Sequence, residues 1–269
     1  MKKLLAIGCL VAEKIKAENL SSTANDMSFK ILLAIFPFLI FLLAVMGFFT
    51  LDIYNLTQNL ENVIPAEILD IVELFTAEIV NVRRPHVLST SLFVAAWSST
   101  SGFKSLIAGI NKAYGEKEER NFIKKYAISF VLVSIFAFTL VLMMIFLIFG
   151  GIIIDTIGQF VQLPRHGAML FSVSSTVISV IIMLAAVILI NSVALEKKVK
   201  FKNLLPGSLF TVTIWIIASV GFNIYVRNFS NMAAVYGSVA GVMVLMMWVN
   251  IICNVLLIGS AINAVTLSR

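Results

Sequence analysis

The stretch AISFVLVSIFAFTLVLMMIFLIFGGII, which runs from Ala127 to Ile153, contains no charged residue and decides the class of this protein. An apolar run of about 20 residues is long enough to cross a hydrocarbon layer of about 30 Å as a helix. The run is continuous and lacks the alternation of apolar and polar residues typical of a membrane β-barrel. Because only helices and closed barrels satisfy their backbone hydrogen bonds in lipid, it predicts a transmembrane helix.

Five further stretches are long and largely apolar, and the composition of the chain agrees with them. Hydrophobic residues make up 60% of the 269 residues, charged residues 13%, and the mean hydropathy is +1.01. The six predicted spans cover residues 27–49, 87–110, 127–153, 168–193, 204–226 and 236–267. We therefore predict an all-α fold, a polytopic membrane helix bundle with six transmembrane helices in a single membrane domain over residues 1–269. The last span is longer than a bilayer requires, so it should tilt or project.

The distribution of Lys and Arg predicts the orientation of the spans. Basic residues in short loops are retained on the cytoplasmic side. Of the 20 Lys and Arg residues, 14 fall on the side that carries both termini: Lys2, Lys3, Lys14, Lys16, Lys112, Lys117, Arg120, Lys124, Lys125, Lys197, Lys198, Lys200, Lys202 and Arg269. Both termini are therefore predicted to be cytoplasmic, in a multi-pass protein of the cell membrane.

Two amphipathic segments are predicted outside the spans. Residues 1–20 have Leu4, Ile7, Val11 and Ile15 at helical spacing with lysines opposite, which indicates a cytoplasmic surface helix. A lipoprotein signal is the alternative, disfavoured because the apolar run is short and no small-residue cleavage pattern follows it. Residues 51–86 are acidic with a helical apolar repeat and are predicted to form one or two extracytoplasmic helices. Packing as a cap on the bundle is favoured there over ligand binding.

The second span carries more polarity than a lipid-facing helix tolerates. On a helical wheel it has two neighbouring stripes: Trp97, Ser101, Lys104, Ala108 and Asn111 form one, and Ser98, Gly102, Ser105 and Gly109 form the other. The small residues of the second stripe favour close helix packing, whereas the first stripe must meet protein or water. Lys104 either snorkels towards the cytoplasmic side or lines a cavity.

Residues of other spans extend both sets. Asn250 and Asn254 share a face of the last span, and together with Trp97, Ser101, Lys104 and Asn111 they form the candidate solute pathway. Pro37 can kink the first span, and Gly237 and Gly241 lie one turn apart in the last, so these three join the candidate packing set. Such residues hold helices together in many membrane proteins. The alternative, a pathway lined by polar groups, is motivated by the cost of an intramembrane charge.

Several segments together carry a family resemblance. The stretch from Trp97 to Gly115 contains Trp-Ser-Ser, Gly-Phe, Leu-Ile and Asn-Lys-Ala-Tyr-Gly in order, and further matching segments are Leu33 to Pro37, Leu204 to Gly207, Gly221 to Tyr225, Val235 to Ser238, and Trp248. This set resembles the YihY/BrkB family of bacterial inner-membrane proteins over nearly the whole chain. The resemblance implies six transmembrane helices and no established catalytic activity.

The chain departs from the family pattern where a mechanism would depend on it. Members often read Gly-Ala-Glu near the end of the last span, but this chain has Gly259-Ser260-Ala261, and Asn250 replaces a Tyr two residues after the Trp. A Tyr-and-Pro pattern is also missing around Asn191 to Leu195. Proton coupling through the family's Glu therefore cannot be carried over to Ala261.

Catalysis is not expected, although some family members have carried a ribonuclease name. His86 and His166 fall on the outer side, away from RNA, and Glu116, Glu118 and Glu119 lie among basic residues, which indicates a solvated loop. The two isolated cysteines form neither a disulfide framework nor a metal set. No metal, cofactor or nucleotide-binding motif is expected.

Two classes of function remain. The first is a transporter or translocator of a lipid-like or anionic amphipathic solute, without nucleotide hydrolysis. The second is a non-catalytic membrane scaffold that assists envelope assembly or integrity. The lipid bilayer is the expected partner, and a homo-oligomer is compatible with the sequence. Because topology accounts for the pI near 9.4, no nucleic-acid partner is expected.

Overall fold

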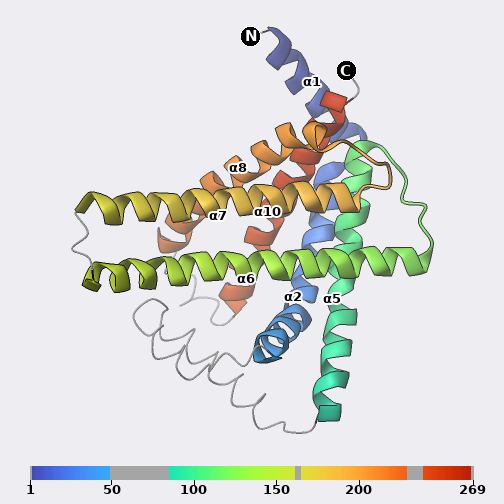
Figure 1. The fold of residues 1–269 in the computed structure, drawn as a ribbon. Helices are drawn as coiled ribbons and strands as arrows, with labels where there is room; N and C mark the ends of the chain where they lie inside the picture. Colours follow the sequence, from blue (N-terminus) through green and yellow to red (C-terminus); the bar gives the residue numbers. More distant parts are fainter. Residues whose placement is uncertain (1, 49–84, 161–164, 229–238, 268–269) are drawn as a thin grey trace. The chain divides into compact units, whose positions relative to one another are not determined.

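The computed structural model describes residues 2–48, 85–160, 165–228 and 239–267, and the regular structure of these residues is entirely helical (Figure 1). The helices are α1 (Lys2–Ala17), α2 (Leu20–Phe48), α5 (Pro85–Tyr114), α6 (Phe122–Phe160), α7 (Arg165–Ala194), α8 (Phe201–Asn228) and α10 (Val239–Leu267). The all-α prediction is confirmed. The predicted outer segment lies outside the described residues except for its last two, which begin α5.

Six helices, α2, α5, α6, α7, α8 and α10, coincide with the six predicted spans. Within their described residues, four of them contain stretches long and apolar enough to cross a membrane: Phe122–Met143, Thr176–Ala194, Phe201–Tyr225 and Gly241–Leu267. The chain is therefore a membrane protein with several apolar helices. The count of six crossings stays a prediction.

Two residues with left-handed backbone conformation separate the helices near the N-terminus and after α5. The prediction of one helix over residues 1–20 requires correction, because Asn19 has a φ of 48° and divides α1 from α2. Asparagine tolerates this conformation better than most residues. Gly115, with a φ of 78°, ends α5 in a Schellman motif, in which its N–H donates to Lys112 O and the Glu116 N–H donates to Asn111 O.

The described chain forms two compact units, residues 1–32 with 102–269 (the larger unit) and residues 33–101 (the smaller unit). In the larger unit α6 and α7 lie side by side, as both figures show, and α7 also contacts α8, while α10 contacts α8 and α1. The C-terminal half of α10 is the core of this unit. Its buried residues are Val255, Leu256, Leu257, Gly259, Ser260, Ala261, Asn263, Ala264 and Val265.

Glycines allow α8 and α10 to approach within backbone contact. A Cβ atom at Gly207 would collide with the Gly259 carbonyl oxygen, and a Cβ atom at Gly259 would collide with the Thr211 hydroxyl. The Gly207 N–H also donates to Asn263 Oδ1 at 2.6 Å, and Trp215 Nε1 donates to Ile252 O at 3.1 Å. Two helices that share backbone contact and cross-helix hydrogen bonds form a rigid pair.

Replacement of Gly259 by Ala should therefore destabilise the protein, because the added methyl group overpacks the contact at a cost of about 1–3 kcal/mol. The melting temperature in detergent should fall. Gly241→Ala is the matched control on the same helix, since a Cβ atom there meets nothing within 4 Å and should leave the melting temperature unchanged or slightly raised. Equal effects at both glycines would show that the contact does not limit stability.

Candidate functional site

Lys104 contacts α6 through Tyr126. Its Nζ atom donates to the Tyr126 hydroxyl at 2.8 Å and lies 4.0 Å from the centroid of the Tyr126 ring. Phe103, the residue before Lys104, also contacts α6, because its ring lies 5.9 Å from the ring of Phe136 between centroids. Adjacent residues of α5 thus contact α6 residues about three turns apart, so α5 crosses α6 at this point. The half-buried ammonium group is fixed at the crossing by an aromatic partner.

Asn111, three residues before the end of α5 at Tyr114, is buried among different neighbours. Its Nδ2 group lies within hydrogen-bond distance of Ile107 O, Glu118 Oε2 and Ala194 O, at 2.8–2.9 Å. Its Oδ1 atom accepts from the Glu196 N–H at 3.0 Å. Asn111 therefore joins the end of α5, the loop after it and the end of α7, and its hydrogen-bonding capacity is used within the protein.

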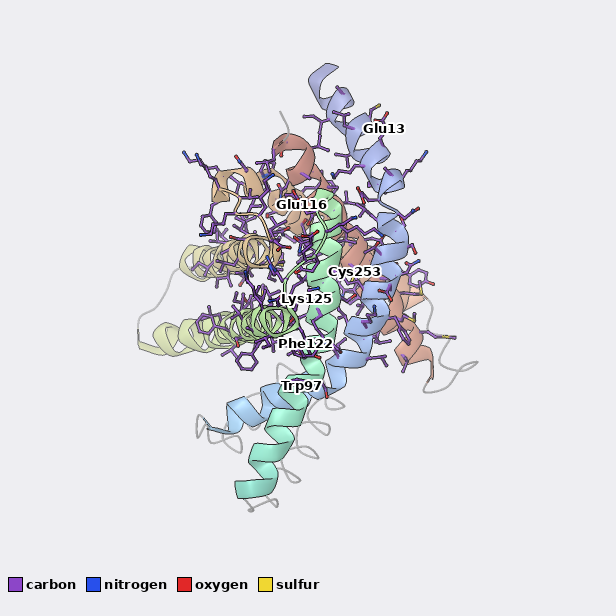
Figure 2. All side chains as sticks on the ribbon, turned by 90° about the vertical axis from the view of Figure 1, so that its right-hand side faces the viewer. Glu13, Trp97, Glu116, Phe122, Lys125 and Cys253 are labelled. Atoms are coloured by element: carbon purple, nitrogen blue, oxygen red, sulfur yellow. The ribbon has the colours of Figure 1, made fainter. Side chains whose placement is uncertain are left out.

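The loop after α5 was expected to be solvated, and this expectation is only partly right. Glu116 and Glu119 are exposed, and Figure 2 labels Glu116 on this loop with Lys125 in the following helix. Arg120, however, is 8% exposed; it donates to Ala194 O at 3.0 Å and lies 3.7 Å from the Glu118 carboxylate. These contacts supply the partners that a buried guanidinium needs. The sequence thus locates the charges of this loop but does not reveal that Arg120 is buried.

Asn250 bonds to α2, and Asn254 bonds to Asn250. The Asn250 amide donates to Asn25 Oδ1 at 2.7 Å and lies 3.2 Å from Ser28 Oγ. The Asn254 amide donates to Asn250 O at 2.9 Å and approaches Asn250 Oδ1 at 3.0 Å. We call these four residues the amide seam. Asn25 is exposed and the two asparagines of α10 are half-buried, so the seam has polar surface.

The other pathway residues belong to the smaller unit. Trp97 is half-exposed, and its carbonyl oxygen accepts from the Thr100 hydroxyl at 2.6 Å. Ser101 is exposed and donates to Ser98 O at 2.9 Å, one turn earlier in α5. In the larger unit, the described pathway residues fall into three groups with different neighbours. These groups are Lys104, Asn111, and the pair Asn250 and Asn254.

The candidate packing residues differ in what surrounds them. A Cβ atom at Gly109 would lie 3.2 Å from both Leu257 and Met27, so this glycine lies at a helix contact. Gly102 is buried and Ser105 half-buried. A Cβ atom at Gly241 meets nothing within 4 Å. Pro37 lies within α2 with its side chain outside the described residues, and Gly237 is also outside them.

Several polar contacts of the core were missed in the sequence. The Ser260 hydroxyl donates to Asn191 Oδ1 at 2.9 Å and joins α10 to α7. Asn263 holds the Gly207 N–H, and it also lies beside Tyr114, whose pKa is raised by burial and partly lowered by this neighbour. These residues are isolated polar positions in apolar helices, and that isolation is the signal that could have identified them.

The described residues hold no group of three or more His, Cys, Asp and Glu side chains that could bind a metal ion. The side chains of His86 and His166 are outside the described set. The absence of catalytic activity stays a prediction.

The apolar helices, the glycine contact and the buried polar contacts define a multi-pass helical membrane protein. Within that class the chain belongs to the BrkB family: a sequence model described as Virulence factor BrkB matches residues 11–269. The predicted family is confirmed.

Relatives from two bacteria match almost the whole chain. The ribonuclease-like protein YfkH of Bacillus subtilis is 29% identical over 248 residues, which cover 92% of this chain and 90% of the relative. A UPF0761 membrane protein of Photobacterium profundum is 26% identical over 272 residues, which cover 98% of this chain and 82% of the relative. No solved structure matches the chain significantly.

Asn111→Ala should lower stability, because it removes the hydrogen bonds to Ala194 O and to the partly buried Glu196 N–H. Ala194 O keeps Arg120 as a donor, whereas the Glu196 N–H loses its partner, and an unpaired group of this kind costs about 1–3 kcal/mol. The measurement is the melting temperature in detergent. Asn223→Ala, at an exposed position of α8, is the control and should change it little. A loss of stability no larger than that of the control would exclude a structural role for Asn111.

Proposed function

We propose that this chain is a translocator that moves a lipid-like or anionic amphipathic solute across the bacterial inner membrane, without catalysis and without nucleotide hydrolysis. Six spans and cytoplasmic termini are part of the proposal. Family membership and the apolar helices support a membrane role, and the amide seam supports passage of a polar group.

The amide seam carries the proposal because of where it lies. The α10 stretch Gly241–Leu267 has a mean hydropathy of 2.3, yet Asn250 and Asn254 lie within it. A polar amide in hydrocarbon is costly unless it finds hydrogen bonds. Both amides do so, but Asn25 remains exposed at the edge of the seam. A lipid headgroup that moves along α10 could exchange hydrogen bonds with these groups.

The seam also has hydrogen-bonding capacity to offer. Asn250 uses its Nδ2 group towards α2, and Asn254 uses its Nδ2 group towards Asn250. Within the part of the chain that the structure describes, Asn25 Nδ2 and Asn254 Oδ1 have no protein partner. One donor and one acceptor are thus available to a solute at neighbouring positions, which suits a headgroup with both hydroxyl and ester oxygens.

A scaffold that assists envelope assembly is the second candidate, and a different observation favours it. The C-terminal half of α10 is closed by interlocking side chains and by the glycine contact with α8. A static membrane anchor requires this kind of packing. A translocator is compatible with it when movement is confined to the more exposed N-terminal half of α10.

The purified protein should accelerate lipid movement in vesicles that contain phosphatidylglycerol with a fluorescent acyl chain. A membrane-impermeant reductant should then quench more fluorescence than in protein-free vesicles. Asn250→Leu should slow the movement about tenfold, as expected for a loss of about 1.4 kcal/mol of stabilisation along the path. Ser219→Leu is the control, since its hydroxyl bonds only to Trp215 O of its own helix among the described residues.

No acceleration by the unmodified protein would argue against translocation of this lipid class and favour the scaffold. Equal rates for Asn250→Leu and Ser219→Leu would remove the seam from the pathway while leaving translocation in place.

The proposed topology rests on the basic residues, which resist translocation. Cysteine labelling tests it. In a variant without Cys9 and Cys253, cysteine in place of Glu67 should react with a membrane-impermeant thiol reagent in intact cells. Cysteine in place of Lys198, which is exposed, should react only after the cells are opened. The reverse pattern would invert the orientation.

A further inference from the structure

Lys104 differs from the other lysine within a predicted span. Lys30 forms an ion pair with Asp26 at 2.7 Å, one turn earlier in α2. Among the described side chains, Lys104 has no carboxylate within ion-pair distance and contacts the Tyr126 hydroxyl instead. A half-buried charge in an apolar segment is costly without a counter-charge. Within the described part of the chain, the Lys104 ammonium group thus has no counter-charge.

The geometry leaves the ammonium group able to bind an anion. A lysine ammonium has three N–H donors, and the Tyr126 hydroxyl accepts one of them. The ring of Tyr126 holds the ammonium in place through its π-face, 4.0 Å away at the centroid. Two donors of a positioned cation thus remain for a ligand.

Apolar and aromatic surface flanks this cation. The Phe122 ring lies 4.4 Å from the Tyr126 ring between centroids, and Phe122 is 67% exposed. On the other side of the crossing, Phe136 is exposed beside Phe103. A ligand with one charged group and an adjoining hydrocarbon part would meet complementary surface at both ends, whereas a small free anion would use only the charge.

The charged group best suited to this site is a phosphodiester. The compact ammonium of lysine binds a phosphate oxygen as a point charge, and a phosphodiester joins that charge directly to a hydrocarbon part. Exposed Lys124, two residues before Tyr126, adds positive charge at the start of α6.

We infer that Lys104 and Tyr126 form the headgroup site for the phosphate of an anionic phospholipid, with its acyl chain along the exposed aromatic side chains of α6. This inference rests on the proposed function and names the substrate class as phosphate-bearing lipid. It adds a binding contact in the larger unit that is separate from the amide seam.

Native mass spectrometry of the purified protein with phosphatidylglycerol and phosphatidylcholine tests the site. The unmodified protein should retain phosphatidylglycerol preferentially, and Lys104→Met should weaken its binding about tenfold through loss of a charge-assisted contact. Lys104→Arg should retain most of the binding. Lys30→Met is the matched control and should bind as the unmodified protein does, because its charge is already paired.

Equal phosphatidylglycerol binding by Lys104→Met and Lys30→Met, at matched melting temperatures, would overturn the inference. Displacement of the lipid by inorganic phosphate alone would overturn its lipid part and indicate a soluble phosphate ester. Binding is measured without transport, so its outcome is independent of the vesicle assay. Lipid binding that depends on Lys104 without lipid movement would uphold the site and reject the translocator.

Discussion

The backbone contact between Gly207 and Gly259 is the constraint on which the larger unit depends. It brings α8 and α10 together so closely that no side chain fits between them, and it places Asn263 where it can bind the Gly207 N–H. Hydrophobic burial supplies little driving force between helices in lipid, so such packing and cross-helix hydrogen bonds must hold them together. The C-terminal half of α10 therefore becomes the centre around which α1, α8 and the described ends of α2, α5 and α7 are arranged.

Polar groups in this apolar environment fall into two kinds. Asn111, Arg120 and Asn191 are buried and find partners on other elements, so they stabilise connections between helix ends. Lys104, Asn250 and Asn254 are half-buried and Asn25 is exposed, and the proposed function and the proposed lipid site rest on this second kind.

The two relatives match 92% and 98% of this chain, so the similarity covers nearly the whole chain rather than one segment. The ribonuclease-like name belongs to the Bacillus subtilis relative, whereas the Photobacterium profundum relative is named only as a membrane protein. At the position of the family's Gly-Ala-Glu, this chain uses Ser260 for a hydrogen bond to Asn191 and buries Ala261 completely. The C-terminal end of α10 is thus a packing element here.

The sequence by itself determined the all-α class, the positions of six long helices and the family, because hydropathy and motif order are properties of consecutive residues. It placed Lys104 and Asn111 on one stripe, but only the tertiary structure showed that Lys104 meets Tyr126 while Asn111 meets Ala194 and Glu118. It selected Gly109 as a packing residue, yet gave no emphasis to the contact between Gly207 and Gly259. The physical reason is that the partner of a helical residue depends on where two helices cross and how each is rotated, and the sequence of neither helix contains that information.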